Sequence, residues 1–218
     1  MFPVSDVIPP RRVPIVTIAI IVAGTSTFVY EVQLDRPEVF DLARRFGVVP
    51  AALSWPGLFT SLFIHDGWVH LAANMLYLWI FGANVEDSMG RPVYLFFYLG
   101  AGCVGALVHA GLHPASARPL IGATCAIAAV LGAYFVVFPK SQVLVVAGLL
   151  RAREAIEVPA ALFLAAWILL MMIRDFHSIG AHAADVTMTF GAEAAGFATG
   201  VAAGAVLRWR GRLWELSS

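Results

Sequence analysis

Two polar residues interrupt an apolar stretch and are spaced for a shared role. His70 and Asn74 lie four positions apart, so they share one face if this stretch is helical. Asn74 supplies an amide donor, and the imidazole of His70 can donate or accept a hydrogen bond. Such a pair can stabilise the negative charge that develops on a carbonyl oxygen during acyl transfer. The alternative is that both side chains only hydrogen-bond to neighbouring helices or loops.

A hydroxyl and a thiol are adjacent in Gly122-Ala-Thr124-Cys125-Ala, where every other residue is small. A hydroxyl or thiol becomes a nucleophile when a base lies beside it. A threonine in a membrane helix more often hydrogen-bonds to its own backbone, and a buried cysteine more often packs as a small apolar residue. Thr124 and Cys125 are therefore candidate nucleophiles, each with a structural alternative.

The carboxyl group of Glu193 stands alone in a long apolar stretch near the C-terminus. A charge at the centre of a bilayer costs about 2.5–3.5 kcal/mol, so such groups usually have a function. Glu193 could act as a base, carry a proton or bind an ion, or it could be protonated and bonded to a neighbouring helix. In each case we expect it to point inward, near Thr124 and the face of His70 and Asn74.

No metal or cofactor is predicted. The remaining histidines fall near expected helix ends or in a late loop, two of them beside acidic residues: His109, His113, His177 near Asp175, and His182 near Asp185. A solvated loop explains them better than a metal site. The two cysteines, Cys103 and Cys125, lie in apolar runs, and no spacing typical of a zinc site occurs.

The composition indicates which elements must position these groups. Of the 218 residues, 60% are hydrophobic and 13% are charged, and the mean hydropathy is +0.82. Soluble domains average about 45–50% apolar and about 25% charged residues, so an ordinary soluble enzyme and a disordered chain are excluded. The 14 basic and 14 acidic residues cancel, which excludes a nucleic-acid binder. We expect an all-α membrane protein.

Six stretches approach the length of about 20 apolar residues that a membrane helix needs. They are residues 13–30, 67–85, 92–112, 120–138, 158–173 and 186–207, and together they form one transmembrane domain over 1–218. Residues 31–66 are too polar to span and are predicted to be an external loop with short helices. Residues 143–150 are apolar but too short, which predicts a surface-lying connection.

The distribution of basic residues predicts the orientation. With the N-terminus in the cytoplasm, nine arginines and lysines lie inside and five lie outside. Because inside loops carry the excess of basic residues, both termini are predicted to be cytoplasmic.

The pattern of motifs resembles the rhomboid family of intramembrane serine proteases. Thr60 to Gly90 resembles the second span of that family, residues 120–138 the fourth, and Gly196-Phe-Ala-Thr-Gly200 the sixth. The resemblance covers nearly the whole chain and implies a six-transmembrane-helix rhomboid-like bundle. It also implies membrane lipid and single-span transmembrane proteins as partners, while the oligomeric state stays open. A chain without added domains resembles prokaryotic members, which implies the inner (plasma) membrane. Glu86 with Gly90-Arg91 is expected to be a structural clamp.

The resemblance also assigns roles to the polar residues. His70 and Asn74 match the pair that helps to bind the oxyanion. Thr124 stands at the position of the serine nucleophile, Cys125 at that of the following glycine, and Glu193 at that of the histidine base. Both positions of the catalytic dyad are therefore substituted.

Two interpretations follow, and a third is weaker. In the first, the protein is a pseudoprotease that recognises single-span helices without cutting them. In the second, it is an active endopeptidase, with Thr124 or Cys125 as nucleophile and Glu193 or His70 as base. In the third, Glu193 and His70 form a buried proton-binding pair, as in a transporter.

Overall fold

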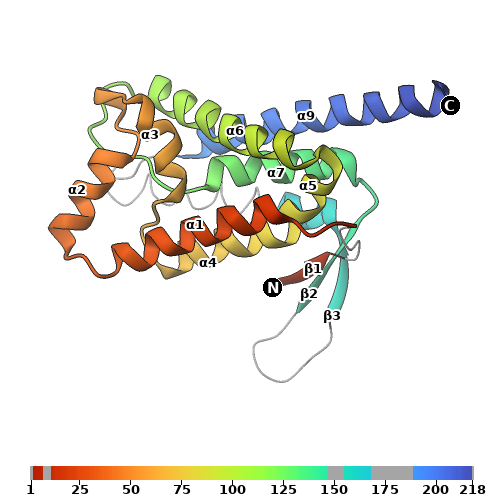
Figure 1. Ribbon diagram of the computed structural model, residues 1–218, viewed down its shortest axis with the longest axis horizontal. Coiled ribbons are helices and arrows are strands. Elements are labelled where there is room, and N and C mark those ends of the chain that lie inside the picture. The colour runs from red at the N-terminus through yellow and green to blue at the C-terminus, as the bar shows by residue number, and fades with distance from the viewer. Residues whose placement is uncertain (1, 7–10, 147–154, 168–188, 218) are drawn as a thin grey trace.

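The computed structural model describes residues 2–6, 11–146, 155–167 and 189–217, and helices form most of them. The bundle contains α1 (Ile15–Glu31), α4 (Trp68–Tyr77), α5 (Ala83–Met89), α6 (Arg91–Leu112), α7 (Thr124–Val137) and α9 (Phe190–Ser217), and residues 160–167 are also helical. Figure 1 shows these helices running roughly along one axis.

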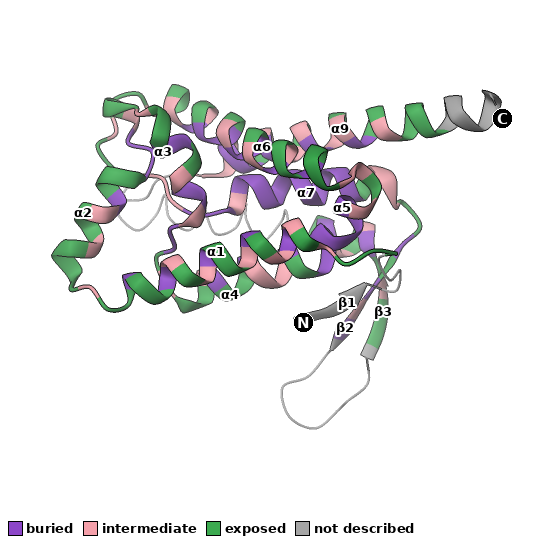
Figure 2. Ribbon diagram, in the orientation of Figure 1, coloured by how far each residue is buried: buried purple, intermediate pink, exposed green. Residues whose placement is uncertain are grey.

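Helix α7 forms the centre of the bundle. Every residue from Cys125 to Tyr134 is buried, as expected of a helix that is apolar on all faces. Helices α6 and α9 pack against it, and α4 contacts it as well (Figure 2). The candidate nucleophile Thr124 is thus the first residue of this buried helix.

Glycines let α7 and α9 approach closely. A Cβ atom added at Gly196 would overlap the carbonyl oxygen of Cys125, and one at Gly200 would overlap that of Ala129. A Cβ atom at Gly204 would lie 2.9 Å from the carbonyl oxygen of Ala133. The repeat of small residues every four positions therefore lies on the face of α9 that contacts α7.

The second predicted span is one continuous helix from Trp68 to Met89, longer than the predicted 67–85. A π-helical segment, Leu78–Gly82, joins α4 to α5, and Gly90 ends the helix with φ +79°. The predicted clamp at Glu86 is present, because its carboxylate accepts hydrogen bonds from the backbone N–H groups of Val16 (3.1 Å) and Thr17 (2.8 Å). Those N–H groups belong to the first turn of α1, where no intrahelical acceptor exists.

The predicted polar loop contains short helices, as expected. They are α2 (Arg36–Phe46), α3 (Trp55–Thr60) and two single turns, Pro50–Ala52 and Ser61–Phe63. A capping box formed by Asp35 and Glu38 starts α2, and the Ser54 hydroxyl caps α3. In Figure 1 these helices lie at the opposite end of the molecule from the β-sheet.

The prediction of an all-α chain is wrong at one end of the molecule. Strands β1 (Phe2–Asp6), β2 (Gln142–Val146) and β3 (Ala155–Pro159) form an antiparallel sheet in the order β1-β2-β3. Residues 143–146, predicted as a surface-lying connection, belong to β2. Alternate residues Val143 and Val145 are buried, because successive side chains of a strand point to opposite faces.

Two helix boundaries also differ from the predictions. Helix α7 begins at Thr124 and not at residue 120, because Leu120 pairs with Val48 in an isolated β-bridge. The fifth span, predicted to start at residue 158, begins later, because Val158 and Pro159 belong to β3 and the helix starts at residue 160. Residues 168–173 and 186–188 of the last two predicted spans lie outside the described residues.

Among the described residues, two helices are long and apolar enough to cross a membrane, Arg91–Leu112 and Phe190–Gly211. Helices Ile15–Glu31 and Thr124–Val137 are apolar but shorter. The count of six membrane spans therefore remains a prediction.

Candidate active site

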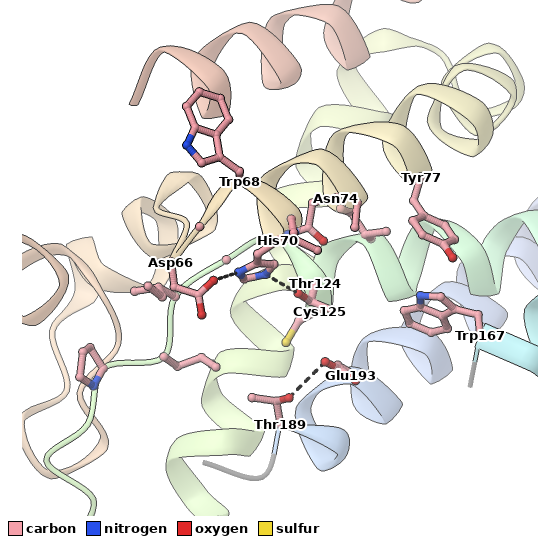
Figure 3. A pocket seen from close by; sticks show the side chains of 18 residues that line it. Asp66, Trp68, His70, Asn74, Tyr77, Thr124, Cys125, Trp167, Thr189 and Glu193 are labelled. Carbon is pink, nitrogen blue, oxygen red and sulfur yellow. Dashed lines mark hydrogen bonds and ion pairs between the residues drawn. The ribbon is translucent and has the colours of Figure 1, made fainter. Parts of the chain in front are cut away.

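The candidate residues line one cavity of about 800 Å³ at the start of α7. His70, Asn74, Thr124, Cys125 and Glu193 all contribute to its wall, and they come from α4, α7 and α9 (Figure 3). Glu193 is 3% exposed and points inward, as expected. Segments far apart in the sequence thus bring a hydroxyl, a thiol, an imidazole, an amide and a carboxyl group to one place.

The imidazole of His70 connects two oxygen atoms. Its Nδ1 lies 2.6 Å from Oδ1 of Asp66, and its Nε2 lies 3.2 Å from Oγ1 of Thr124. An ionised carboxylate only accepts hydrogen bonds, so Nδ1 carries the proton and donates it to Asp66. Nε2 is then an acceptor, and the Thr124 hydroxyl donates to it. Figure 3 shows both hydrogen bonds in line across the ring.

Gly122 allows this position of the ring. Its φ of +103° belongs to the left-handed region that glycine adopts readily, and its N–H donates to the carbonyl oxygen of Ser61 at 2.8 Å. A Cβ atom on Gly122 would lie only 2.6 Å from Cε1 of His70. The imidazole therefore packs directly on the backbone of residue 122.

Two sets of hydrogen-bond donors face the region around Thr124. The side chain of Asn74 is buried, and its Nδ2 has no acceptor in the described part of the chain. Thr124 begins α7, and the preceding residue, Ala123, has no side chain that could cap the helix. The N–H groups of a first helical turn carry a partial positive charge that favours an anion.

The carboxyl at the expected base position has a partner in the residue just before its own helix. Oε1 of Glu193 accepts a hydrogen bond from the hydroxyl of Thr189 at 3.1 Å. Cys125 packs against α6, since a Cβ atom on Gly105 would lie 3.0 Å from its sulfur atom. Both residues line the cavity, but Thr124 is the one bonded to the imidazole.

Burial and hydrogen bonding change the acidity of two residues in the loop before α4. Burial lowers the pKa of His65 to about 4, and the neighbouring ring of His70 acts in the same direction. The hydrogen bond from His70 lowers the pKa of Asp66 below its ordinary value. Asp66 is therefore ionised near neutral pH, in agreement with its role as an acceptor.

The structure adds two residues that the sequence analysis missed, Asp66 and Thr189. Each lies four positions before a candidate residue, His70 and Glu193, but both precede the first residue of the helix, so helical spacing alone does not predict them. The rings of His109 and His113 are tilted to each other with their centroids 4.7 Å apart, and neither residue lines the cavity. His177, His182, Asp175 and Asp185 lie outside the described residues. Within the described ranges, no cluster of three potential metal ligands occurs.

Comparison with known proteins identifies the fold family. The model of the rhomboid domain matches residues 52–210, which is most of the chain. This chain belongs to the rhomboid family. Membership implies integration into a membrane, and the resemblance seen in the sequence motifs is confirmed.

Individual rhomboid relatives match a shorter part of the chain. The mitochondrial presenilin-associated rhomboid-like protein of Bos taurus is 32% identical over 88 residues, which cover 39% of this chain and 23% of that protein. Mitochondrial rhomboid protein 1 of Saccharomyces cerevisiae is 33% identical over 89 residues, covering 38% and 25%. The rhomboid protease GluP of Bacillus subtilis is 39% identical over 79 residues, covering 36% and 15%. The matches thus span about a quarter or less of each relative.

Proposed function

We propose that this chain is an integral membrane protein of the rhomboid family that binds transmembrane segments of client proteins without cutting them. One observation carries the proposal. The hydroxyl at the nucleophile position, Thr124, bonds to His70, whereas the carboxyl at the base position, Glu193, accepts from Thr189, the residue just before α9. The family's serine and histidine are both replaced, and their replacements bond to different partners in these two contacts.

The chemistry of peptide cleavage supports this proposal. An amine leaving group must be protonated as the C–N bond breaks, and one histidine normally serves both proton transfers. A carboxylate at position 193 has another reach and geometry than imidazole, and the extra methyl group of Thr124 restricts its rotamers. Altering a catalytic triad costs about 10⁴-fold in rate, so we expect cleavage of clients to be absent or slower by orders of magnitude.

The cavity wall offers an apolar surface for a client helix. Trp68 and Val69 are 66% and 85% exposed at the start of α4. Farther along this helix, the ring of Tyr77 lies 6.3 Å from that of Trp167 and 5.8 Å from that of Phe163. These contacts join α4 to helical residues 160–167. The family resemblance implies that a substrate helix enters between these two elements, so we propose an apolar transmembrane segment as the ligand.

The membrane setting belongs to the same proposal. Membrane lipid and single-span proteins are the expected partners, and both termini are expected in the cytoplasm. The named relatives come from mitochondria and from a bacterium, so a prokaryotic plasma membrane rests on the sequence resemblance alone.

An active intramembrane endopeptidase is the second candidate function. The 3.2 Å hydrogen bond between Thr124 and His70 favours it, because this bond pairs a hydroxyl with a base. Among the nucleophiles and bases considered, it supports Thr124 over Cys125 and His70 over Glu193.

Binding and cleavage of a single-span model protein in proteoliposomes separate the two functions. We would compare the wild type, Thr124→Ala and the double variant Thr124→Ser with Glu193→His, reading cleavage by mass spectrometry and binding by co-purification. Binding without cleavage by the wild type supports the proposal. Cleavage that is lost in Thr124→Ala establishes the endopeptidase, and absence of binding contradicts the proposed function. Cleavage by the double variant alone indicates that the rest of the family's site is intact.

A further inference from the structure

The hydrogen bonds of His70 form a chain that does not include the family's base position. A carboxylate (Asp66), an imidazole (His70) and a hydroxyl (Thr124) follow one another at 2.6 Å and 3.2 Å. Asp66 precedes α4, His70 lies in its first turn, and Thr124 begins α7. This is the order acid, base, nucleophile that unrelated acyl-transfer enzymes share.

We propose that Asp66, His70 and Thr124 form an acyl-transfer relay that hydrolyses neutral activated carboxylic esters in this cavity. Thr124 is the nucleophile, His70 is the general base, and Asp66 is a positioning residue that acts through His70. This activity goes beyond client binding, and it does not need Glu193.

The relay has the donors that an oxyanion requires. If His70 serves as base, it no longer serves as an oxyanion donor. Nδ2 of Asn74 remains as a donor, and it has no acceptor in the described chain. Asn74 is only 5% exposed and lines the same cavity. The first-turn N–H groups of α7 lie beside Thr124 and add a partial positive charge. A buried donor that has no acceptor in the described residues, on a side chain that lines the cavity, points to an oxygen-bearing ligand.

The bond changes balance as follows. The oxygen of Thr124 forms a bond to the ester carbonyl carbon, its proton moves to Nε2 of His70, and the carbonyl π pair moves onto oxygen. The pair returns, the C–O bond to the alcohol breaks, and the leaving group takes the bonding electrons and then the proton held by His70, which restores the neutral imidazole. Water then attacks the acyl-threonine, His70 takes a proton from the water, and a proton returns to Thr124. The products are one carboxylic acid and one alcohol.

The same geometry explains why an ester is favoured over a peptide. Removing one oxyanion donor costs about 10²–10³-fold in rate, and His70 has left that role. A phenolate leaving group departs without protonation, whereas the amine of a peptide does not. The carboxyl groups of Asp66 and Glu193 both line the cavity, which disfavours anionic substrates. Trp68 and Tyr77 supply an apolar wall for a short acyl chain.

Hydrolysis of p-nitrophenyl butyrate by the purified full-length chain in detergent tests the relay. We expect turnover by the wild type, a loss of at least about 100-fold in Thr124→Ala, and retained or faster turnover in Thr124→Ser. Asp66→Asn should reduce turnover about tenfold to hundredfold, because the Asp66 side chain is 70% exposed and its carboxylate is partly screened by water. Asp87→Asn is the matched control, since Asp87 accepts an exposed backbone hydrogen bond from Arg11 and does not line the cavity. It should behave as the wild type.

The pH–rate profile distinguishes positioning from a structural effect. Without the carboxylate, the imidazolium form is less stabilised, so the acid limb of the Asp66→Asn profile should move to lower pH. In the described part of the chain, the titratable groups near the ring are Asp66 itself, His65 (ring centroids 5.2 Å apart) and Glu193 across the cavity, and only Asp66 differs between the proteins. Thermal unfolding of each variant confirms that it is folded.

A fluorophosphonate probe, followed by mass spectrometry, should label Thr124. Three results would overturn the relay: unchanged turnover in Thr124→Ala, labelling of Cys125 instead, or an Asp66→Asn profile that coincides with that of the wild type. Loss of client binding with ester turnover retained would contradict only the proposed function. Binding without ester turnover would contradict only the relay.

Discussion

At the level of single residues, the imidazole of His70 depends on a glycine as much as on its hydrogen-bond partners. The ring has a carboxylate on one side and a hydroxyl on the other, and its edge rests on the backbone of Gly122. Space and backbone conformation at residue 122 therefore determine whether His70 can reach Thr124.

Gly122→Ala should separate the ring from the hydroxyl. The new Cβ atom would lie 2.6 Å from Cε1 and 2.8 Å from Nε2 of His70, and φ +103° is strained for alanine by about 1–3 kcal/mol. We expect a lower melting temperature and at least about a tenfold loss of ester turnover. Gly111→Ala is the control, because nothing lies within 4 Å of its added Cβ atom. Equal behaviour of the two variants would show that the ring does not depend on residue 122.

The stability of the protein should fall with acid in a window set by His65. The pKa of His65 is lowered from its ordinary 6.5 to about 4, so between these values the unfolded chain binds a proton that the folded protein does not. Stability is then lost as pH falls from 6.5 toward 4, with a slope of up to about 1.4 kcal/mol per pH unit. Asp66, whose pKa is lowered from 3.8, has the same sign of effect but acts mainly below this window.

Thermal unfolding in detergent from pH 7 to pH 4.5 measures this slope. His65→Gln should flatten it, whereas His113→Gln, at the end of α6, should leave it unchanged. An identical acid slope in His65→Gln and the wild type would assign the acid sensitivity to other groups.

At the level of elements, the contact of α7 with α9 holds the cavity wall in place. This contact is made by backbone against backbone, because Gly196 and Gly200 face carbonyl oxygens of α7. Neither partner can move aside as a flexible side chain would.

Gly200→Ala should therefore force the two helices apart. Its Cβ atom would overlap the carbonyl oxygen of Ala129, and overpacking of this kind costs about 1–3 kcal/mol. Gly211→Ala, on the same helix with nothing within 4 Å, should have little effect or stabilise the helix slightly. Chemical denaturation in mixed micelles compares them. Equal stability of both variants would mean that α7 and α9 are not in close contact in the membrane.

Elements set by neighbouring residues were predicted correctly from the sequence, and features set by residues far apart in the sequence were not. Helices α1 and α6 lie close to the predicted spans, because proline and glycine mark their starts and a continuous apolar run defines their lengths. The sheet could not be predicted, since β1 pairs with a strand about 140 residues away. The late start of α7 likewise depends on Val48, in the polar loop.

The candidate site shows the same division. His70, Asn74, Thr124 and Glu193 were recognisable, because polar residues are rare in apolar stretches. Asp66 is four residues from His70, but it lies before the first residue of α4, so a helical-face argument does not include it. Its contact depends on the path of the loop.

At the level of the whole molecule, the two ends of the chain share one side. The start of α1 and the end of α9 lie toward the end of the bundle with the sheet, and α2 and α3 lie at the other end (Figure 1). A membrane crossed by this bundle would have both termini on one side, as the basic residues also predict.

Reporters that are active only in the cytoplasm, fused in turn to each terminus, should both be active. A cysteine introduced at Arg44, which is exposed on α2, should react with an impermeant reagent added from outside. The unsubstituted chain is the control, because Cys125 is buried and Cys103 is half-buried. Reporters that disagree with each other would contradict the shared side.

The wide turn between α4 and α5 determines how the protein responds to the deletion of one residue. Leu78–Gly82 is π-helical, and such a turn holds about one residue more than an α-turn. Loss of a single codon within it would leave a regular helix of the same direction. A wide turn with one residue more completes about the same rotation as the α-turn that would replace it, so the phase of His70 and Asn74 relative to Glu86 would change little, whereas a deletion from a regular α-turn would change it by about 100°. A one-residue deletion at this turn should therefore be tolerated better than one within the regular turns of α4 or α5.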